Sequence, residues 1–301
     1  MQLRIESLSK TYPNGVKALK NISLTINQGM FGLLGPNGAG KSSLMRTIAT
    51  LQEADHGRVF LDDLDVLKHK EEVRQILGYL PQDFGVYPRI SAEQMLDHIA
   101  QLKGIGKKSE RKELVSALLD KVNLSKDKKK NLGTYSGGMK QRFGIAQALM
   151  GSPKLIIVDE PTAGLDPAER NRFYNLLSQI GENTIVILST HIVEDVTDLC
   201  PRMAMIAQGR VLIQGEPQAS IDTLKNKVWR RRVTETALPE YQSHFNILST
   251  RLVGGKPQIT VFADAQPDDG FTMVEPNLGD VYFLQLRSAQ SAKQSVTPSV
   301  A

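Results

Sequence analysis

One stretch of the sequence decides the fold: Gly35-Pro36-Asn37-Gly38-Ala39-Gly40-Lys41-Ser42. It fits the complete pattern G-x-x-x-x-G-K-[ST], with a short apolar strand predicted before it at residues 30–34 and a helix after it at 41–50. Glycines let the backbone wrap around a phosphate chain with its N–H groups pointing inward, because side chains there would collide with the oxygens. A purely structural glycine-rich turn is the alternative, and the Lys-Ser pair in register argues against it. This stretch therefore predicts a phosphate-binding loop.

The residues after the glycines supply a charge and a hydroxyl. Lys41 adds a positive point charge, and Ser42 offers a hydroxyl to Mg²⁺. The helix that begins here directs the positive end of its dipole at the phosphates. We therefore predict that a nucleoside triphosphate and Mg²⁺ bind at residues 35–43, a range in which Ser43 also contacts the nucleotide.

A buried strand that ends in two carboxylates supplies the second half of the predicted site. Residues 155–158 are Leu-Ile-Ile-Val, as expected of a parallel strand buried on both faces, and Asp159 and Glu160 follow directly. Asp159 is placed to bind the Mg²⁺ shell, while Glu160 can polarise a water in line with the γ-phosphate. On its own such a pair is most often a solvated turn. Beside a complete phosphate loop we interpret it as catalytic.

The composition excludes several other classes of protein. With 41% hydrophobic and 23% charged residues, the 301-residue chain is typical of a globular protein. Its longest apolar runs, residues 155–158 and 185–188, are far shorter than the roughly 20 residues that cross a bilayer as a helix. The first residues lack the features of a secretion signal, so we expect a cytosolic chain. Cys200 stands alone, which excludes an internal disulfide. The net charge of +5 is too evenly mixed with acidic residues to indicate nucleic acid binding.

Strand and helix patterns predict an α/β core over residues 1–220. Apolar alternation at residues 3–8 and 22–26 predicts antiparallel strands before the phosphate loop. A strand-then-helix unit recurs later, with strands at 155–158 and 184–189 and helices at 167–180 and 192–199. The fold class is therefore α/β, with a P-loop NTPase core built on a mostly parallel sheet.

Two segments depart from this pattern. Helical periodicity without a neighbouring strand, at residues 91–102 and 109–122, predicts a helical insert at about 83–150. Residues 221–287 alternate like short strands separated by turns and predict a small α+β C-terminal module. Residues 288–301 are mostly Ser, Ala, Gln and Thr with little to bury, so we predict a disordered tail.

A third motif identifies a family. Residues 135–142, Tyr-Ser-Gly-Gly-Met-Lys-Gln-Arg, lie just ahead of the acidic strand and resemble the signature of the ATP-binding cassette (ABC) ATPases. Together with Gln82 at the start of the insert and His191 after the next strand, this signature is specific to that family among phosphate-loop proteins. The resemblance covers about the first 220 residues, and it implies ATP as the nucleotide and ATP hydrolysis as the activity.

The resemblance also implies that two cassettes pack head to tail. Ser136 is placed to cap a helix whose first residues, Gly137 and Gly138, leave N–H groups exposed for an anion. In the family each signature closes on the γ-phosphate held by the loop of its partner. We therefore expect a homodimer or pseudo-dimer in which these three residues contact the nucleotide of the other copy.

Further roles are carried over residue by residue. Tyr12 looks like the aromatic residue that stacks on adenine, with an ordinary turn tyrosine as the alternative. Gln82 resembles the residue that contacts Mg²⁺ and the attacking water, and His191 resembles the switch histidine at the γ-phosphate. Residues 163–166, which end at Asp166, look like the loop that crosses to the partner's site. The resemblance thus implies the following functional sets: Glu160, His191, Gln82 and Lys41 as catalytic residues, and Ser42, Gln82 and Asp159 as metal ligands.

The sequence departs from the commonest family pattern at a few positions. Tyr135 and Met139 stand where most members have Leu and Gln, so a side-chain contact is lost while the backbone donors remain. Gly164 replaces a frequent Ala in the cross-dimer loop. Residues 275–283, Glu-Pro-Asn-Leu-Gly-Asp-Val-Tyr-Phe, look like a C-terminal element of cassettes that serve ABC-2 type exporters. An apolar helix covering a small sheet would look the same.

The resemblance implies a motor for export. Separate integral membrane permease subunits would form the channel and dock near residues 83–87, with this chain held peripherally at the cytoplasmic face of the inner (plasma) membrane. The alternative is a soluble ABC ATPase that acts on nucleic acid or ribosomes. Those relatives tend to carry a second cassette, a long coiled-coil insertion or zinc-binding cysteines, none of which is seen here, so no nucleic acid partner is expected.

Overall fold

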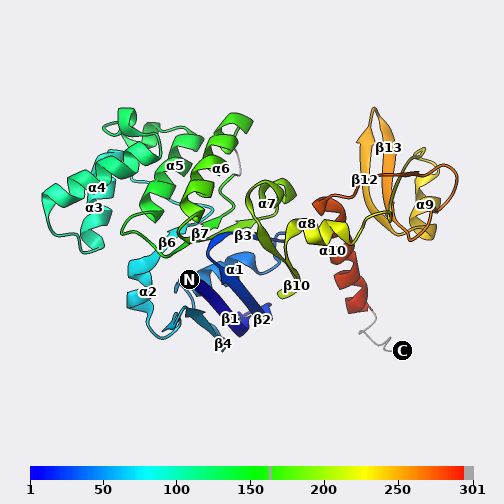
Figure 1. Ribbon diagram of the computed structural model, residues 1–301, viewed down its shortest axis with the longest axis horizontal. Coiled ribbons are helices and arrows are strands. Elements are labelled where there is room, and N and C mark those ends of the chain that lie inside the picture. The colour runs from blue at the N-terminus through cyan, green and yellow to red at the C-terminus, as the bar shows by residue number, and fades with distance from the viewer. Residues whose placement is uncertain (163–164, 295–301) are drawn as a thin grey trace.

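A six-stranded sheet lies at the centre of the computed structural model, which describes residues 1–162 and 165–294 (Figure 1). Its strand order is β10-β9-β3-β8-β7-β6, and every neighbouring pair is parallel except β9 with β10. The strands are β3 (Gly29–Leu34), β6 (Leu77–Leu80), β7 (Leu155–Asp159), β8 (Ile185–Thr190), β9 (Arg202–Ala207) and β10 (Arg210–Gly215).

A second, antiparallel sheet is formed mainly by the N-terminal strands. Its order is β2-β1-β4-β5, with β1 (Gln2–Thr11), β2 (Lys17–Asn27), β4 (His56–Leu61) and β5 (Leu64–Asp65). The two segments predicted to alternate lie within β1 and β2, which pair antiparallel from Gln2 with Asn27 to Thr11 with Lys17, with shifts of register between. The antiparallel sheet that precedes the phosphate loop is therefore confirmed.

Both faces of the central sheet are buried, as expected of parallel strands. In β3, Phe31 and Leu33 pack into the core shared with the N-terminal sheet and α1 (Lys41–Ile48). Met30 and Leu34 alternate with them and pack into the opposite core. This second core contains residues of α6 (Pro167–Gly181) and α7 (Val193–Leu199), whereas the short helix α2 (Lys70–Ile76) contributes Val73 to the first. The predicted P-loop NTPase architecture is confirmed.

Three helices lie between β6 and β7, at the position of the expected insert. They are α3 (Ala92–Leu102), α4 (Lys108–Lys121) and α5 (Gly137–Ala148), with 3-10 turns at Ser125–Asp127 and Leu132–Thr134. Helix α3 begins at a capping box, in which Ser91 and Gln94 each accept a hydrogen bond from the other's backbone N–H. Helices α3, α4, α5 and α6 lie together at one end of the molecule (Figure 1).

The C-terminal segment forms a small module at the other end (Figure 1). Its elements are α8 (Pro217–Asp222), β11 (Val228–Arg232), α9 (Leu238–His244), β12 (Ile247–Val253), β13 (Lys256–Phe262), β14 (Thr272–Met273) and α10 (Leu278–Gln294). The sheet order is β12-β13-β11-β14, and Trp229 and Phe271 belong to its own small core. Helix α10 contacts α7 and α8, and its Leu278 and Val281 belong to the same core cluster as Leu199 of α7.

The predicted disordered tail is wrong for residues 288–294. Helix α10 continues through Ser288 and Ala289 to Gln294, because Ala, Gln and Lys extend a helix readily once a preceding segment is fixed by packing. Residues 295–301 lie outside the described part of the chain, as do Ala163 and Gly164 of the expected cross-dimer loop. Among the described residues, no helix combines the length and the apolar character needed to cross a membrane.

Candidate active site

The phosphate loop connects the end of β3 to the start of α1, and its backbone leaves no room for larger residues at two positions. Gly40 has a φ of +107° immediately before α1, and a Cβ atom there would lie 2.4 Å from the carbonyl oxygen of Ala18. A Cβ atom on Gly35 would lie 2.2 Å from the carbonyl oxygen of Ile206. Glycine is required at both positions because the loop packs directly against the backbone of neighbouring segments.

Lys41 fills the loop from inside in this structure. Its side chain is 5% exposed, and Nζ donates to the carbonyl oxygens of Gly35 at 2.7 Å and Pro36 at 3.2 Å. Burial lowers the pKa of Lys41, while the nearby carboxylates of Glu160 and Asp159 oppose that shift. The ammonium group is therefore held in the loop by acceptors that a phosphate oxygen can replace.

Three side chains converge on the carboxylate of Glu160. Lys41 Nζ lies 3.6 Å from Oε1, and His191 Nδ1 lies 3.1 Å from the same oxygen. Gln82 Nε2 donates to Oε2 at 3.3 Å. The structure thus brings together all four residues expected to be catalytic, from the phosphate loop, the end of β7, the start of the insert and the end of β8.

The backbone at Glu160 turns sharply to make this convergence possible. Glu160 has a φ of +48°, a left-handed conformation that is uncommon for a residue with a side chain. Its N–H donates to the carbonyl oxygen of Ser189 at 2.8 Å, which fixes the turn against the end of β8. Strained backbone of this kind persists only where surrounding bonds hold it, and it is concentrated at functional sites.

Asp159 is the residue whose surroundings best fit a divalent cation. It is 4% exposed, and its Oδ1 atom and the hydroxyl of Ser189 are both buried without a hydrogen-bond partner among the described residues. The two residues face each other in the β7–β8 register. Buried oxygens without partners are rare, and hard oxygen ligands are what Mg²⁺ binds. Together with the exposed hydroxyl of Ser42 at the start of α1, these residues fit Mg²⁺.

A cavity of about 600 Å³ joins the loop to Glu160. This volume lies within the range of small-molecule sites. Most of the predicted site residues line it: Tyr12, Pro36, Asn37, Gly38, Ala39, Gly40, Lys41, Ser42, Ser43, Gln82 and Glu160. Gly35, Asp159 and His191 are not among the lining residues. The cavity therefore extends from the expected base-stacking tyrosine to the expected catalytic carboxylate.

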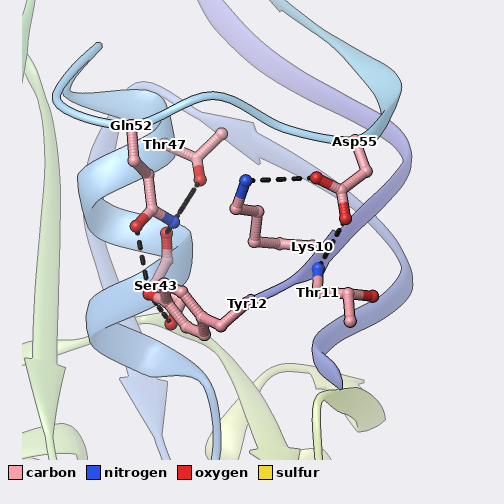
Figure 2. Close-up of polar contacts among 7 residues, drawn as sticks. All are labelled: Lys10, Thr11, Tyr12, Ser43, Thr47, Gln52 and Asp55. Carbon is pink, nitrogen blue, oxygen red and sulfur yellow. Dashed lines mark hydrogen bonds and ion pairs between the residues drawn. The ribbon is translucent and has the colours of Figure 1, made fainter. Parts of the chain in front are cut away.

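Tyr12 is fixed to α1 through its hydroxyl, as Figure 2 shows. The phenol oxygen lies 2.9 Å from the hydroxyl of Ser43 and donates to Oε1 of Gln52 at 3.0 Å. Gln52 Nε2 in turn donates to the Ser43 carbonyl at 2.8 Å and to the Thr47 hydroxyl at 2.9 Å. The ring is thus held at the mouth of the cavity. Sequence reasoning missed Gln52, because it lies in the loop after α1, outside any motif.

The signature residues lie away from this cavity. Ser136 caps α5 by accepting a hydrogen bond from Met139 N at 3.2 Å, as predicted. Ser136 and Gly137 are exposed, and neither they nor Gly138 line the cavity. Asp166 caps α6 by accepting a hydrogen bond from Glu169 N at 2.8 Å. Within one chain none of these residues lines the cavity at the phosphate loop, so any role there needs a second copy.

Comparisons with known proteins agree with this geometry. Residues 19–163 match the ABC transporter family. The linearmycin resistance ATP-binding protein LnrL of Bacillus subtilis (strain 168) is 37% identical, over 71% of this chain and 68% of its own length. The chain belongs to the family of ABC transporter ATP-binding proteins. It is a cassette ATPase, and it binds ATP.

Solved ABC cassettes have the same fold. A dimeric ATP-binding cassette, MJ0796, in a post-hydrolysis state with ADP and phosphate bound, has a TM-score of 0.65 and 25% identity over 71% of this chain and 98% of its own. The cassette cbiO1 from Clostridium perfringens, part of the ABC transporter complex cbiONQ, has a TM-score of 0.66 and 28% identity over 73% of this chain and 90% of its own. ABC cassettes function as dimers, as the first of these structures illustrates.

Proposed function

We propose that this cassette powers export through separate membrane subunits, and that two copies close on two ATP molecules in each cycle. The observation that carries the chemistry is the convergence of Lys41, Gln82 and His191 on Glu160. Two similarities support the transport role: cbiO1 is part of a transporter complex, and LnrL is a resistance protein. The described residues include no membrane-spanning helix, which is consistent with a channel made by other chains.

Each residue of the cluster has a defined task in this proposal. The Lys41 ammonium exchanges its bonds to the loop carbonyls for bonds to phosphate oxygens, and the loop N–H groups and the start of α1 bind the rest of the phosphate chain. Ser42, Asp159 and Gln82 would hold Mg²⁺, which would supply positive charge against the charge that develops on the phosphates. Glu160 polarises the attacking water and accepts its proton.

Gln82 and His191 orient Glu160 before that step. Each binds a different oxygen of the carboxylate, so its plane is set in advance of the reaction. When the nucleotide is present, the ring of His191 turns toward the γ-phosphate. Gln82, at the start of the helical insert, links the conformation of the insert to the presence of the nucleotide. Positioning of this kind supplies a large part of the rate in phosphoryl transfer.

A second copy completes the site. The N–H groups at the start of α5, where Ser136 and Gly137 are exposed, are suited to an anion, and these residues do not line the cavity of their own chain. In a head-to-tail dimer they close on the γ-phosphate of the partner, and Asp166 crosses the same interface. The membrane subunit docks beside the insert at residues 83–87, where Tyr87 is exposed.

Co-purification tests the transport role. The chain is co-expressed with any polytopic membrane protein that a neighbouring reading frame encodes and isolated from membranes in detergent, and ATP hydrolysis is measured on the complex. We expect the chain to remain with its membrane partner and to hydrolyse ATP faster than it does alone. A Lys41→Ala variant should still co-purify but show no hydrolysis. Retention on ribosomes or DNA that depends on ATP, without any membrane partner, would contradict the proposal.

A further inference from the structure

Asp195, on α7, is a fully buried carboxylate with an unusual set of partners. It has 0% exposure, and it takes part in no ion pair among the described residues. A buried carboxylate with neither an ion pair nor hydrogen-bond donors would strongly destabilise the fold. Three hydroxyl groups bind it instead. Tyr174 of α6 donates to Oδ1, while Thr162 and Thr190 both donate to Oδ2 at 2.8 Å.

The two threonines belong to the two loops that carry the reaction. Thr162 follows Glu160 by two residues, and Thr190 immediately precedes His191. The Thr190 hydroxyl also accepts a hydrogen bond from the N–H of Ile192 at 3.0 Å, so the residues on both sides of His191 are fixed to one point. A single oxygen of Asp195 therefore joins the segment after Glu160 to the segment around His191.

We propose that Asp195 is a positioning residue for ATP hydrolysis, because it sets the spacing between Glu160 and His191 through Thr162 and Thr190. This inference rests on the proposed roles of Glu160 and His191. Their side chains lie 3.1 Å apart, and that separation depends on how the two loops are held relative to each other. Because both residues must meet the γ-phosphate and its attacking water, a small shift between the loops changes the rate far more than the affinity.

The chemistry of the site favours a carboxylate, which accepts hydrogen bonds through both of its oxygens. Both oxygens of Asp195 accept hydrogen bonds, and one of them accepts two. An asparagine offers one acceptor oxygen and an NH₂ group that only donates, so it can accept from the hydroxyls on one side only, and a hydroxyl on the other side would have to reverse its role from donor to acceptor. Hydrogen bonds to an ionised acceptor are also about twice as strong as neutral ones. A simple tie between α6 and α7 would need only the bond from Tyr174.

The test compares Asp195→Asn with Tyr174→Phe in the full-length chain. We expect Asp195→Asn to lower kcat for MgATP hydrolysis about 10- to 100-fold, with KM for ATP within about threefold of the original chain. Tyr174→Phe removes the third bond to the same carboxylate but leaves both threonines bound, so its kcat should stay within about threefold. The proposal would be overturned if both variants lost kcat in proportion to the drop in their thermal unfolding midpoints. An unchanged kcat in Asp195→Asn would overturn it as well.

Substitutions at the threonines keep the test decisive if Asp195→Asn fails to fold. Thr162→Val and Thr190→Val each remove one hydroxyl at nearly constant volume, and Thr162→Ser and Thr190→Ser retain it. We expect the Val variants to lose kcat and the Ser variants to keep most of it. Where Asp195→Asn does fold, adding it to the double Val variant should cause no further loss, and an additional multiplicative loss would show that Asp195 acts by another route. A Glu160→Gln variant measured alongside separates the two ideas: if it hydrolyses ATP normally, the role given to Glu160 fails rather than that of Asp195.

Discussion

Lys41 Nζ and Glu160 Oε1 lie 3.6 Å apart, so the lysine of the phosphate loop and the carboxylate at the end of β7 form an ion pair across the cavity. Both side chains are largely buried, where charges interact more strongly than in water. A triphosphate that enters between them replaces this internal partner of Lys41. The ion pair therefore keeps the ammonium inside the loop, ready to bind phosphate.

Removal of the ammonium should weaken nucleotide binding as well as turnover. We expect Lys41→Ala to raise the Kd for MgATP by about tenfold or more, because a charge-assisted bond to phosphate is worth about 2 kcal/mol. Lys154→Ala, at an exposed position just before β7, is the matched control and should bind as the original chain does. The measurement is a titration with a fluorescent ATP analogue. Unchanged affinity in Lys41→Ala would refute the assignment of the phosphate loop.

The hydroxyl of Tyr12 should affect affinity and leave the chemical step alone. Tyr12→Phe keeps the ring but removes its bonds to Ser43 and Gln52, so we expect KM for ATP to rise about two- to tenfold with kcat unchanged. Tyr12→Leu removes stacking on the base as well and should cost about 1–3 kcal/mol of binding free energy. Gln52→Leu should behave like Tyr12→Phe. If all three variants kept the KM for ATP of the original chain, Tyr12 would be only a structural turn residue.

Helix α10 should stabilise the ATPase core as well as the C-terminal module. Leu278 is 1% exposed and packs in the core cluster shared with α7, so Leu278→Ala should lower the free energy of unfolding by about 2–5 kcal/mol. Leu252 is 71% exposed, and Leu252→Ala should change the free energy of unfolding by less than about 0.5 kcal/mol. Thermal unfolding monitored with and without ATP provides both values. If the ATPase core and the C-terminal module unfolded in separate transitions, and Leu278→Ala left the midpoint of the ATP-sensitive transition unchanged, the result would contradict this packing.

The thiol of Cys200 should be unreactive until the protein unfolds. Burial raises its pKa, and the nearby Asp195 carboxylate adds to the effect. The folded state therefore keeps a proton that the unfolded state loses, and this group makes folding less favourable as the pH rises through the ordinary thiol range. Labelling with a disulfide reagent at pH 8 should be slow in native protein and fast in denaturant. Because the chain has one cysteine, rapid labelling of native protein would show that α7 opens readily.

Much of the fold follows from local sequence. The phosphate loop, the apolar strand before Asp159 and the helix cap at Ser136 each depend on neighbouring residues, and each was predictable for that reason. Residues 288–294 were not, because a polar helix end is specified only by the packing of α10 that precedes it.

The candidate site was predictable only in part. Its motif residues could be named from the sequence, whereas Gln52 and Asp195 could not, since the partner that links each of them to the site is distant along the chain. Gln52 matters through Tyr12, which lies 40 residues earlier. Asp195 binds Thr162, 33 residues earlier. No local pattern records such pairs, and only the folded backbone brings them together.

The most direct test of the central claim is the effect of Glu160→Gln on hydrolysis and assembly. Gln keeps the size of the side chain but cannot accept a proton from water, so ATP should still bind while hydrolysis falls by at least about 100-fold. In MgATP the variant should accumulate as a closed dimer, and light scattering should record twice the mass found in ADP. Full hydrolysis by Glu160→Gln, or a mass that stays monomeric with ATP bound, would contradict the account.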